Sequence, residues 1–262
     1  MNLSLYNRVA VICGGSQGIG YASAVAIANL GATCILVARS EASLQQAVAT
    51  LPTPSGQVHC YYVADLLLTN DITDTCNKIL SMYKPTILVN NSGGPAGGAL
   101  LSASSEQFLT AFTQHLIANQ LLTQAFVPTM QAMGYGRIIQ IISTSVKAPL
   151  QGLGVSNTIR AAVASWAKTL ANEIGYTGIT VNNILPGATV TDRLSNLIEK
   201  QAAAQGKTII AVEDEWKTVI PAKRFGLPEE IANAVAFLAS PAASYINGVS
   251  LPVDGGRSPN LN

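Results

Sequence analysis

Short runs of apolar, β-branched residues alternate with helix-length segments along the chain. The apolar runs that predict strands are 8–13, 33–38, 58–63, 87–90, 137–142, 179–184 and 248–253. They are continuous, as in Ile35-Leu36-Val37, which is typical of parallel strands buried on both faces. The segments between them have helical patterns at 18–30, 41–50, 69–82, 105–133, 155–174 and 228–239. This alternation predicts an α/β fold with a doubly wound parallel sheet of seven strands.

The 262 residues show no linker, repeat or shift in composition, so we expect 1–262 to form one domain. Segment 188–227 departs from the alternation: it has helix-like pieces at 193–204 and 213–219 but no strand before residue 248. An insertion after a late strand lies above the carboxyl edge of the sheet, where ligands bind in such folds. We therefore expect 188–227 to cover the substrate; the alternative is an ordinary surface excursion.

Charge composition excludes several classes of partner. Fifteen basic and fourteen acidic residues give a net charge of +1 with no basic block, which argues against a nucleic-acid partner. The uncharged stretch 9–38 is interrupted by glycines and leaves no piece long enough to span a membrane. Residues 1–8 lack the cationic start and apolar run of a signal peptide, so we expect a soluble, cytoplasmic protein.

Cysteine and histidine usage argues against metal or disulfide chemistry. Four cysteines are widely spaced with no C-x-x-C pair, which is typical of reduced, buried thiols. The two histidines, His59 and His115, belong to no cluster with ligand spacing. We expect no metal site.

A glycine-rich turn follows the first predicted strand. Gly14, Gly18 and Gly20 have G-x-x-x-G-x-G spacing, and a nearly uncharged helix begins within the turn. Such glycines turn the chain and let backbone approach phosphate, and the helix N-terminus offers free N–H groups to a pyrophosphate. The turn, with its Ser16 and Ile19, is therefore a candidate dinucleotide-binding site.

The end of the second predicted strand indicates which dinucleotide binds. An acidic residue there would hold the ribose diol of NAD, but the chain has Ala38 followed by Arg39. A small residue leaves room for a 2′-phosphate and a guanidinium supplies donors for it, so NADP(H) is favoured over NAD. The alternative is that Arg39 is only a solvated residue at a strand end.

Five motifs together identify a family resemblance. They are Gly14-x-x-x-Gly18-x-Gly20, Asp65-Leu66, Asn90-Asn91-Ser92-Gly93, Pro186-Gly187-x-Thr189-x-Thr191 and Val253-Asp254-Gly255-Gly256. In this order and spacing, from about residue 5 to 256, the chain resembles the classical short-chain dehydrogenase/reductase family. The resemblance implies a single Rossmann-type domain. It also implies that Asp65 meets the adenine amino group, that Leu66 beside it also binds the cofactor, and that Asn91 lies along the cofactor. Pro186, Gly187, Thr189 and Thr191 would hold the nicotinamide carboxamide.

The catalytic pattern of that family is altered. The family uses a tyrosine as proton donor, a lysine four residues later, an upstream serine and a helix asparagine. Ser143 is at the serine position, but Ser156 replaces the tyrosine, Arg160 the lysine and His115 the asparagine. Ser156 and Arg160 lie one helical turn apart, and with Ser143 they make a set of donors suited to an oxyanion or carboxylate. Arg160 can also donate to the ribose hydroxyls of the cofactor.

Two other residues are candidate proton donors. Lys147 follows Ser143 in a loop leaving a strand's carboxyl end, and His115 could relay protons at neutral pH. The alternatives are an exposed loop lysine and a buried core histidine. General acid catalysis contributes about 10²–10⁴-fold, whereas orienting the reactants can supply about 7–11 kcal/mol, so loss of the tyrosine need not abolish hydride transfer.

Residues 145–149, Ser-Val-Lys-Ala-Pro, followed by residues 155–160, Val-Ser-Asn-Thr-Ile-Arg, resemble an atypical 3-oxoacyl-acyl-carrier-protein-reductase-like subgroup with SxxxR in place of YxxxK. The sequence thus predicts an NADP(H)-dependent oxidoreductase that acts on a small-molecule carbonyl or alcohol, with a 3-oxoacyl thioester as one candidate. The main alternative is an NADP(H)-binding sensor or partner subunit without chemistry. A purely structural interaction protein would leave segment 186–191 without a purpose.

Two helices indicate self-association. The segments 105–133 and 155–174 carry apolar residues on more than one side: Phe112, Leu116, Leu121, Leu122, Phe126, Val163, Trp166, Leu170 and Ile174. Helices with excess apolar surface often pair with a symmetry mate, so we expect a homo-oligomer. The family resemblance implies a tetramer.

Overall fold

A single parallel sheet organises the chain, whose computed structural model describes residues 1–259. The strand order is β3-β2-β1-β4-β5-β6-β7, and every neighbouring pair is parallel. The strands are β1 (Val9–Cys13), β2 (Thr33–Ala38), β3 (Cys60–Val63), β4 (Ile87–Asn90), β5 (Gly136–Ile141), β6 (Ile179–Pro186) and β7 (Ser250–Val253). The predicted seven-stranded, doubly wound α/β fold is confirmed. Strand β3 starts two residues later than predicted, because Val58 is largely exposed.

Strand order reverses at β1, which creates the crevice that later holds the site. Val11 pairs with Ile35 of β2 on one side and with Leu88 of β4 on the other. From β1 the chain proceeds outward to β2 and β3, then returns across the sheet to β4. Connections leave β1 and β4 toward opposite sides at this point, so their carboxyl ends enclose an open crevice.

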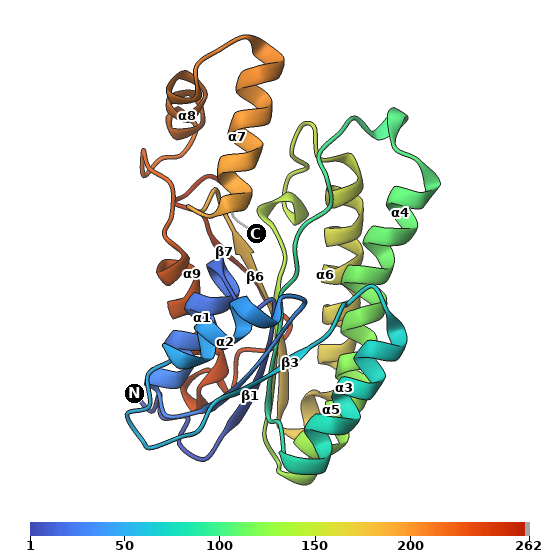
Figure 1. Cartoon of the computed structure of the whole chain (residues 1–262), viewed down its shortest axis with the longest axis vertical. Coiled ribbons are helices and arrows are strands. Elements are labelled where there is room, and N and C mark those ends of the chain that lie inside the picture. The colour runs from blue at the N-terminus through green and yellow to red at the C-terminus, as the bar shows by residue number, and fades with distance from the viewer. Residues whose placement is uncertain (260–262) are drawn as a thin grey trace.

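Helices cover both faces of the sheet (Figure 1). One layer contains α1 (Gly18–Asn29), α2 (Glu41–Ala49) and α9 (Pro228–Ala239), and the other contains α3 (Thr69–Met82), α4 (Ser105–Phe112), α5 (Ala118–Ala132) and α6 (Gly154–Ile174). Each layer buries its own hydrophobic core against the sheet. The first core contains Ile27, Leu44 and Val235, and the second contains Ile79 and Phe126.

The predicted helix 105–133 is interrupted. A π-helical segment, Thr113–Ile117, separates α4 from α5 and carries His115. Apolar residues continue at helical spacing through this segment, so the change in winding has no counterpart in the sequence pattern. Single-turn π segments are often found at functional sites.

The insertion 188–227 forms a compact helical pair. It contains α7 (Asp192–Gln205) and α8 (Ile209–Thr218), both somewhat longer than the predicted pieces. Leu194, Ile198 and Val212 are buried between them. In Figure 1 the pair stands beyond the end of the sheet, at the top of the view.

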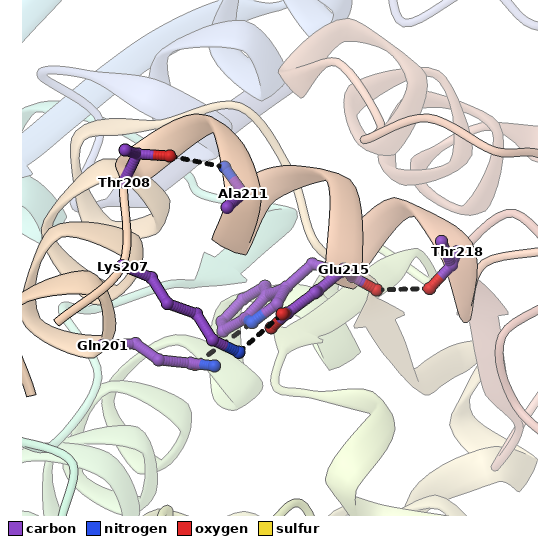
Figure 2. A network of polar contacts seen from close by, with 7 residues as sticks. Gln201, Lys207, Thr208, Ala211, Glu215 and Thr218 are labelled. Carbon is purple, nitrogen blue, oxygen red and sulfur yellow. Dashed lines mark hydrogen bonds and ion pairs between the residues drawn. The ribbon is translucent and has the colours of Figure 1, made fainter. Parts of the chain in front are cut away.

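Polar contacts hold the insertion together and close its base. Lys207 Nζ, in the segment that connects the two helices, pairs with Glu215 Oε1 of α8 at 2.6 Å (Figure 2). At the base, the backbone N–H of Val190 donates to Gly226 O at 2.9 Å, and that of Gly226 donates to Ala188 O at 2.9 Å. The insertion therefore begins and ends at one point beside the carboxyl end of β6.

Much of the apolar surface predicted to pair with a second subunit is buried within this chain. Leu122, Phe126 and Val163 are fully buried, whereas Phe112 of α4 is exposed.

Within residues 1–259, no helix combines the length and the apolarity that a membrane crossing needs.

Candidate functional site

A cavity of about 660 Å³ opens at the carboxyl edge of the sheet. Its walls come from the segments that follow β4, β5 and β6, from the start of α6 and from the insertion. Among its lining residues are Ile19, Asn91, Ser92, Gly94, Ser143, Thr144, Ser156, Arg160, Pro186, Gly187, Thr189, Thr191, Arg193, Gln201, Gln205, Trp216 and Arg257. The topology thus brings half of the predicted site residues into one space: Ile19, Asn91, Ser143, Ser156, Arg160, Pro186, Gly187, Thr189 and Thr191.

The turn after β1 is a backbone cradle that requires glycine. Gly14 and Gly18 have positive φ angles of 58° and 55°. A Cβ on Gly20 would lie 2.0 Å from the carbonyl oxygen of Gly14, so no larger residue fits there. Asn91 Nδ2 donates to the carbonyl oxygens of Cys13 and Gly14 at 3.3 Å each, which joins the turn to the end of β4.

The N-terminus of α1 is open to an anion. Within the described part of the chain no side chain caps it at Gln17, and its first turn contains no acidic residue. Its free N–H groups and the helix dipole favour a negative charge at this point. Thr191 lies against it, because a Cβ on Gly18 would be 3.4 Å from Thr191 Cγ2. The residues present therefore fit a dinucleotide pyrophosphate.

The other predicted cofactor residues lie around this turn. Ser16, Asp65 and Leu66 are half-buried, and Asp65 Oδ1 accepts from the backbone N–H of Leu67 at 3.0 Å. Arg39 is exposed and makes no hydrogen bond or ion pair among residues 1–259, which leaves its guanidinium available for a phosphate.

The segment after β6 is fixed by its own hydroxyl groups. Thr189 Oγ1 donates to Gly187 O at 3.1 Å, and Thr191 Oγ1 donates to Thr189 O at 3.2 Å. A Cβ on Gly187 would lie 2.7 Å from Asp254 Cα, so glycine is required where the segment passes the end of β7. This segment, held by these contacts, leads directly into the start of α7.

Ser143, Ser156 and Arg160 line the same cavity. Ser143 Oγ accepts from the backbone N–H of Ser145 at 3.1 Å. Arg160 is buried, and its Nη1 donates to Ile141 O at 2.9 Å. Burial, and then the nearby positive charge of Arg193, lower the pKa of Arg160 to about 10, so this side chain still carries its charge at neutral pH.

His115 is buried behind the cavity wall and contacts it through Ser92. Ser92 Oγ and His115 Nδ1 are 2.7 Å apart, whereas Nε2 has no hydrogen-bond partner among the described residues. Burial, and then the charges of Arg160 and Arg193, lower the pKa of His115 to about 2. The imidazole is therefore neutral at physiological pH and could pass a proton only by exchanging tautomers.

Lys147 is not among the residues that line the cavity. It is half-buried and directly follows the short helix Thr144–Val146, with its backbone N–H donating to Thr144 O at 2.9 Å. Within residues 1–259, no group of three or more histidine, cysteine or acidic residues could hold a metal ion.

Sequence reasoning missed several lining residues. Ser92 belongs to the Asn-Asn-Ser-Gly motif, for which only Asn91 had a predicted role. Arg193 and Arg257 gave no signal, because only the fold brings the start of α7 and the chain after β7 to one cavity. Trp216 and Gln201 belong to the insertion, and the Trp216 Nε1–H donates to Gln201 Oε1 at 3.1 Å.

Comparison with known proteins places this architecture among established enzymes. The sequence model of a family described as enoyl-(acyl carrier protein) reductase matches residues 14–258. L-sorbose reductase from Gluconobacter frateurii, solved with NADPH and L-sorbose, superposes with a TM-score of 0.94 at 32% identity, over 100% of both chains.

Curated relatives with similar identity have different substrates in their names. The 3-oxoacyl-[acyl-carrier-protein] reductase FabG of Pseudomonas aeruginosa is 32% identical over 97% of this chain and 98% of its own. The 7alpha-hydroxysteroid dehydrogenase of Escherichia coli is 30% identical over 100% of this chain and 98% of its own. Overall similarity therefore indicates the class of chemistry but does not select one substrate.

Neutral burial of His115 predicts a loss of stability in acid. Its folded pKa of about 2 lies below the usual value of 6.5, so between these values the unfolded chain binds a proton that the folded chain does not. The free energy of unfolding therefore falls as the pH falls through this window. From pH 7 to pH 5, we expect His115→Asn to lose about 2 kcal/mol less than the unmodified chain, measured by urea unfolding. Equal losses would contradict this assignment.

Proposed function

Because the chain belongs to the classical short-chain dehydrogenase/reductase family, we propose that it is an NADP(H)-dependent oxidoreductase. It interconverts a carbonyl and an alcohol without the family's tyrosine. The observation that carries this proposal is the close glycine cradle at the open N-terminus of α1, which adjoins a cavity lined by hydroxyl and guanidinium groups. The NADPH in the structure of L-sorbose reductase supports the choice of cofactor.

The predicted binding residues divide the cofactor between them. Gly14, Ser16, Gly18, Ile19 and Gly20 hold the pyrophosphate at the helix N-terminus. The 2′-phosphate is bound by Arg39, and the adenine by Asp65 and Leu66. Asn91, Arg160 and the segment 186–191 hold the ribose and nicotinamide against the cavity. NADPH, when bound, supplies the hydride.

The catalytic proposal assigns oxyanion stabilisation to the cavity wall. Ser143 and Ser156 donate hydrogen bonds to the substrate oxygen, and the charge of Arg160 stabilises the negative charge that develops there. Arg160 stays protonated at neutral pH, so it does not supply the proton itself. Preorganised donors of this kind contribute most when they are shielded from water, and we assign that shielding to the insertion 188–227.

The proton reaches the oxygen by a different route from that of the family. Ser92 lines the cavity and is hydrogen-bonded to His115, so this pair can pass a proton inward by tautomer exchange. Lys147, which follows Ser143 by four residues, is the second candidate donor. A 3-oxoacyl thioester is one candidate substrate, which the similarity to FabG supports.

We propose a homo-oligomer, a tetramer by family resemblance, in which the exposed Leu109 and Phe112 of α4 contact a second copy.

The alternative function is an NADP(H)-binding sensor or partner subunit without chemistry. It is favoured by one observation, the absence of a phenol at Ser156 beside an arginine that holds its proton.

Turnover tests the proposed function directly. The protein is mixed with NADPH and a panel of ketones, β-ketoacyl thioesters and quinones, and loss of NADPH absorbance is followed. We expect turnover in the unmodified chain and none with Gly20→Ala, whose Cβ would collide with Gly14 O. Gly98→Ala is the matched control, because its Cβ would meet no atom within 4 Å. Absence of turnover with the whole panel would overturn the oxidoreductase proposal.

Restoring the family residues separates an enzyme from a binding protein. The double variant Ser156→Tyr with Arg160→Lys is expected to raise kcat/KM for a simple ketone by about 10²–10⁴-fold, because it supplies the missing general acid. Arg160→Lys alone is the matched control, since it lacks the phenol. If NADPH binds but the double variant shows no turnover, the cavity is not competent for reduction and the alternative function holds.

Removal of Arg39 tests the choice of dinucleotide. Loss of a charged hydrogen bond to the 2′-phosphate predicts that Arg39→Gln binds NADPH about tenfold more weakly while NADH affinity is unchanged. Fluorescence titration with the two nucleotides measures both affinities. If the NADPH/NADH ratio is the same in both proteins, Arg39 is only a solvated residue.

A further inference from the structure

The charges around the cavity have one sign. Arg160, Arg193 and Arg257 line it, and no aspartate or glutamate of residues 1–259 does. The chain as a whole is nearly neutral, with a net charge of +1, so this local excess does not follow from composition. A partly enclosed site with several cations and no anion favours a negatively charged ligand.

Arg160 shows that this charge is not compensated within the protein. Its side chain is 7% exposed, and its Nη1 donates to a backbone carbonyl, but no carboxylate in the described chain pairs with it. The positive charge of Arg193 acts on it from nearby. A buried charge without a partner is unfavourable, so an anion that enters the cavity is stabilised by relieving this cost.

Arg193 is held in position before any ligand arrives. Its Nη1 donates to Gly94 O at 2.9 Å and its Nη2 to Pro95 O at 3.2 Å, which connects α7 to the loop after β4. The helix that carries it is joined to α8 by the hydrogen bond from Trp216 Nε1 to Gln201 Oε1 at 3.1 Å, and Lys207, which follows α7, pairs with Glu215 of α8 (Figure 2). A guanidinium fixed in this way retains further donors for a planar oxyanion and loses little side-chain entropy on binding.

Arg257 approaches the cavity from another part of the sheet. It follows β7, the edge strand next to β6, and its backbone N–H donates to Asp254 O at 3.3 Å. Its side chain makes no ion pair or hydrogen bond within residues 1–259. The phosphates of the proposed cofactor are assigned elsewhere, to the turn after β1 and to Arg39 after β2. Arg193 and Arg257 therefore remain for the substrate.

We propose that the substrate carries an anionic group, a carboxylate or a phosphate, that Arg193 and Arg257 bind while its carbonyl or alcohol oxygen faces Ser143 and Ser156. This inference rests on the proposed function for the identity of the reacting group, but the anion site itself does not. Bidentate recognition by arginine is geometrically matched to both kinds of oxyanion.

Binding of small probes to the NADP⁺-saturated protein tests the site. Malonate and inorganic phosphate represent the two anions, and malonamide is the neutral analogue of malonate. In calorimetric titration, we expect at least one of the two anions to bind at least about tenfold more tightly than malonamide. The anion that binds more tightly identifies the anionic group of the substrate. Equal, weak binding of all three probes would overturn the proposal.

Variants locate the site. Arg193→Gln is expected to lower the affinity for the preferred anion about tenfold and to leave NADP⁺ affinity within about twofold. Lys78→Gln removes one positive charge from an exposed position on α3, outside the cavity, and should change neither affinity. Arg257→Gln is the second variant if Arg193→Gln does not fold. Unchanged anion affinity in the arginine variant would contradict the assignment.

The two proposals fail in different ways. If NADP⁺ does not bind, the proposed oxidoreductase function is wrong, and the same titrations of the ligand-free protein still decide whether an anion site exists. If NADPH is oxidised with neutral ketones while malonate and phosphate bind no better than malonamide, the function holds and the anionic substrate class is wrong.

Discussion

The contact between the turn after β1 and the start of α1 determines what this fold can bind. Gly20 lies so close to Gly14 that a single methyl group would overlap a carbonyl oxygen, and Asn91 holds the same turn from the end of β4. Because β1 and β4 are neighbours only at the point where strand order reverses, sheet topology and cofactor site depend on each other. The helix that begins in this turn has no side-chain cap and no acidic residue in its first turn, so its N-terminus is open to an anion.

Two buried titratable side chains at the cavity beside this turn have opposite protonation states at neutral pH. His115 is buried as a neutral base, with a pKa of about 2, whereas Arg160 is buried as a charged acid that retains its proton. The positive charge of Arg160 contributes to the neutrality of His115. Replacing the family's lysine by arginine therefore affects His115 as well as position 160. The arginine keeps its proton and its positive charge disfavours a charged imidazole, so neither side chain readily releases a proton.

The fold was largely predictable from sequence because its signals are local. Continuous apolar runs identified all seven strands, and the glycines at 14, 18 and 20 marked the cofactor turn. Three features were not predictable. The π-helical winding around His115 leaves the apolar pattern unchanged. Arg193 and Arg257 reach the cavity through tertiary contacts between segments distant in sequence. The burial of Leu122 and Val163 within the chain depends on how α5 and α6 pack.

The paired hydrogen bonds between Ala188, Val190 and Gly226 join the two ends of the insertion at one junction beside the sheet. Its helices bury their apolar side chains mainly against each other. Two contacts tie its first part to the rest of the site, because Thr191 lies against Gly18 and Arg193 donates to Gly94 O and Pro95 O. Divergence in the part of the insertion beyond these contacts, where Gln201, Gln205 and Trp216 line the cavity, can therefore alter the shape of the cavity while the glycine cradle is kept.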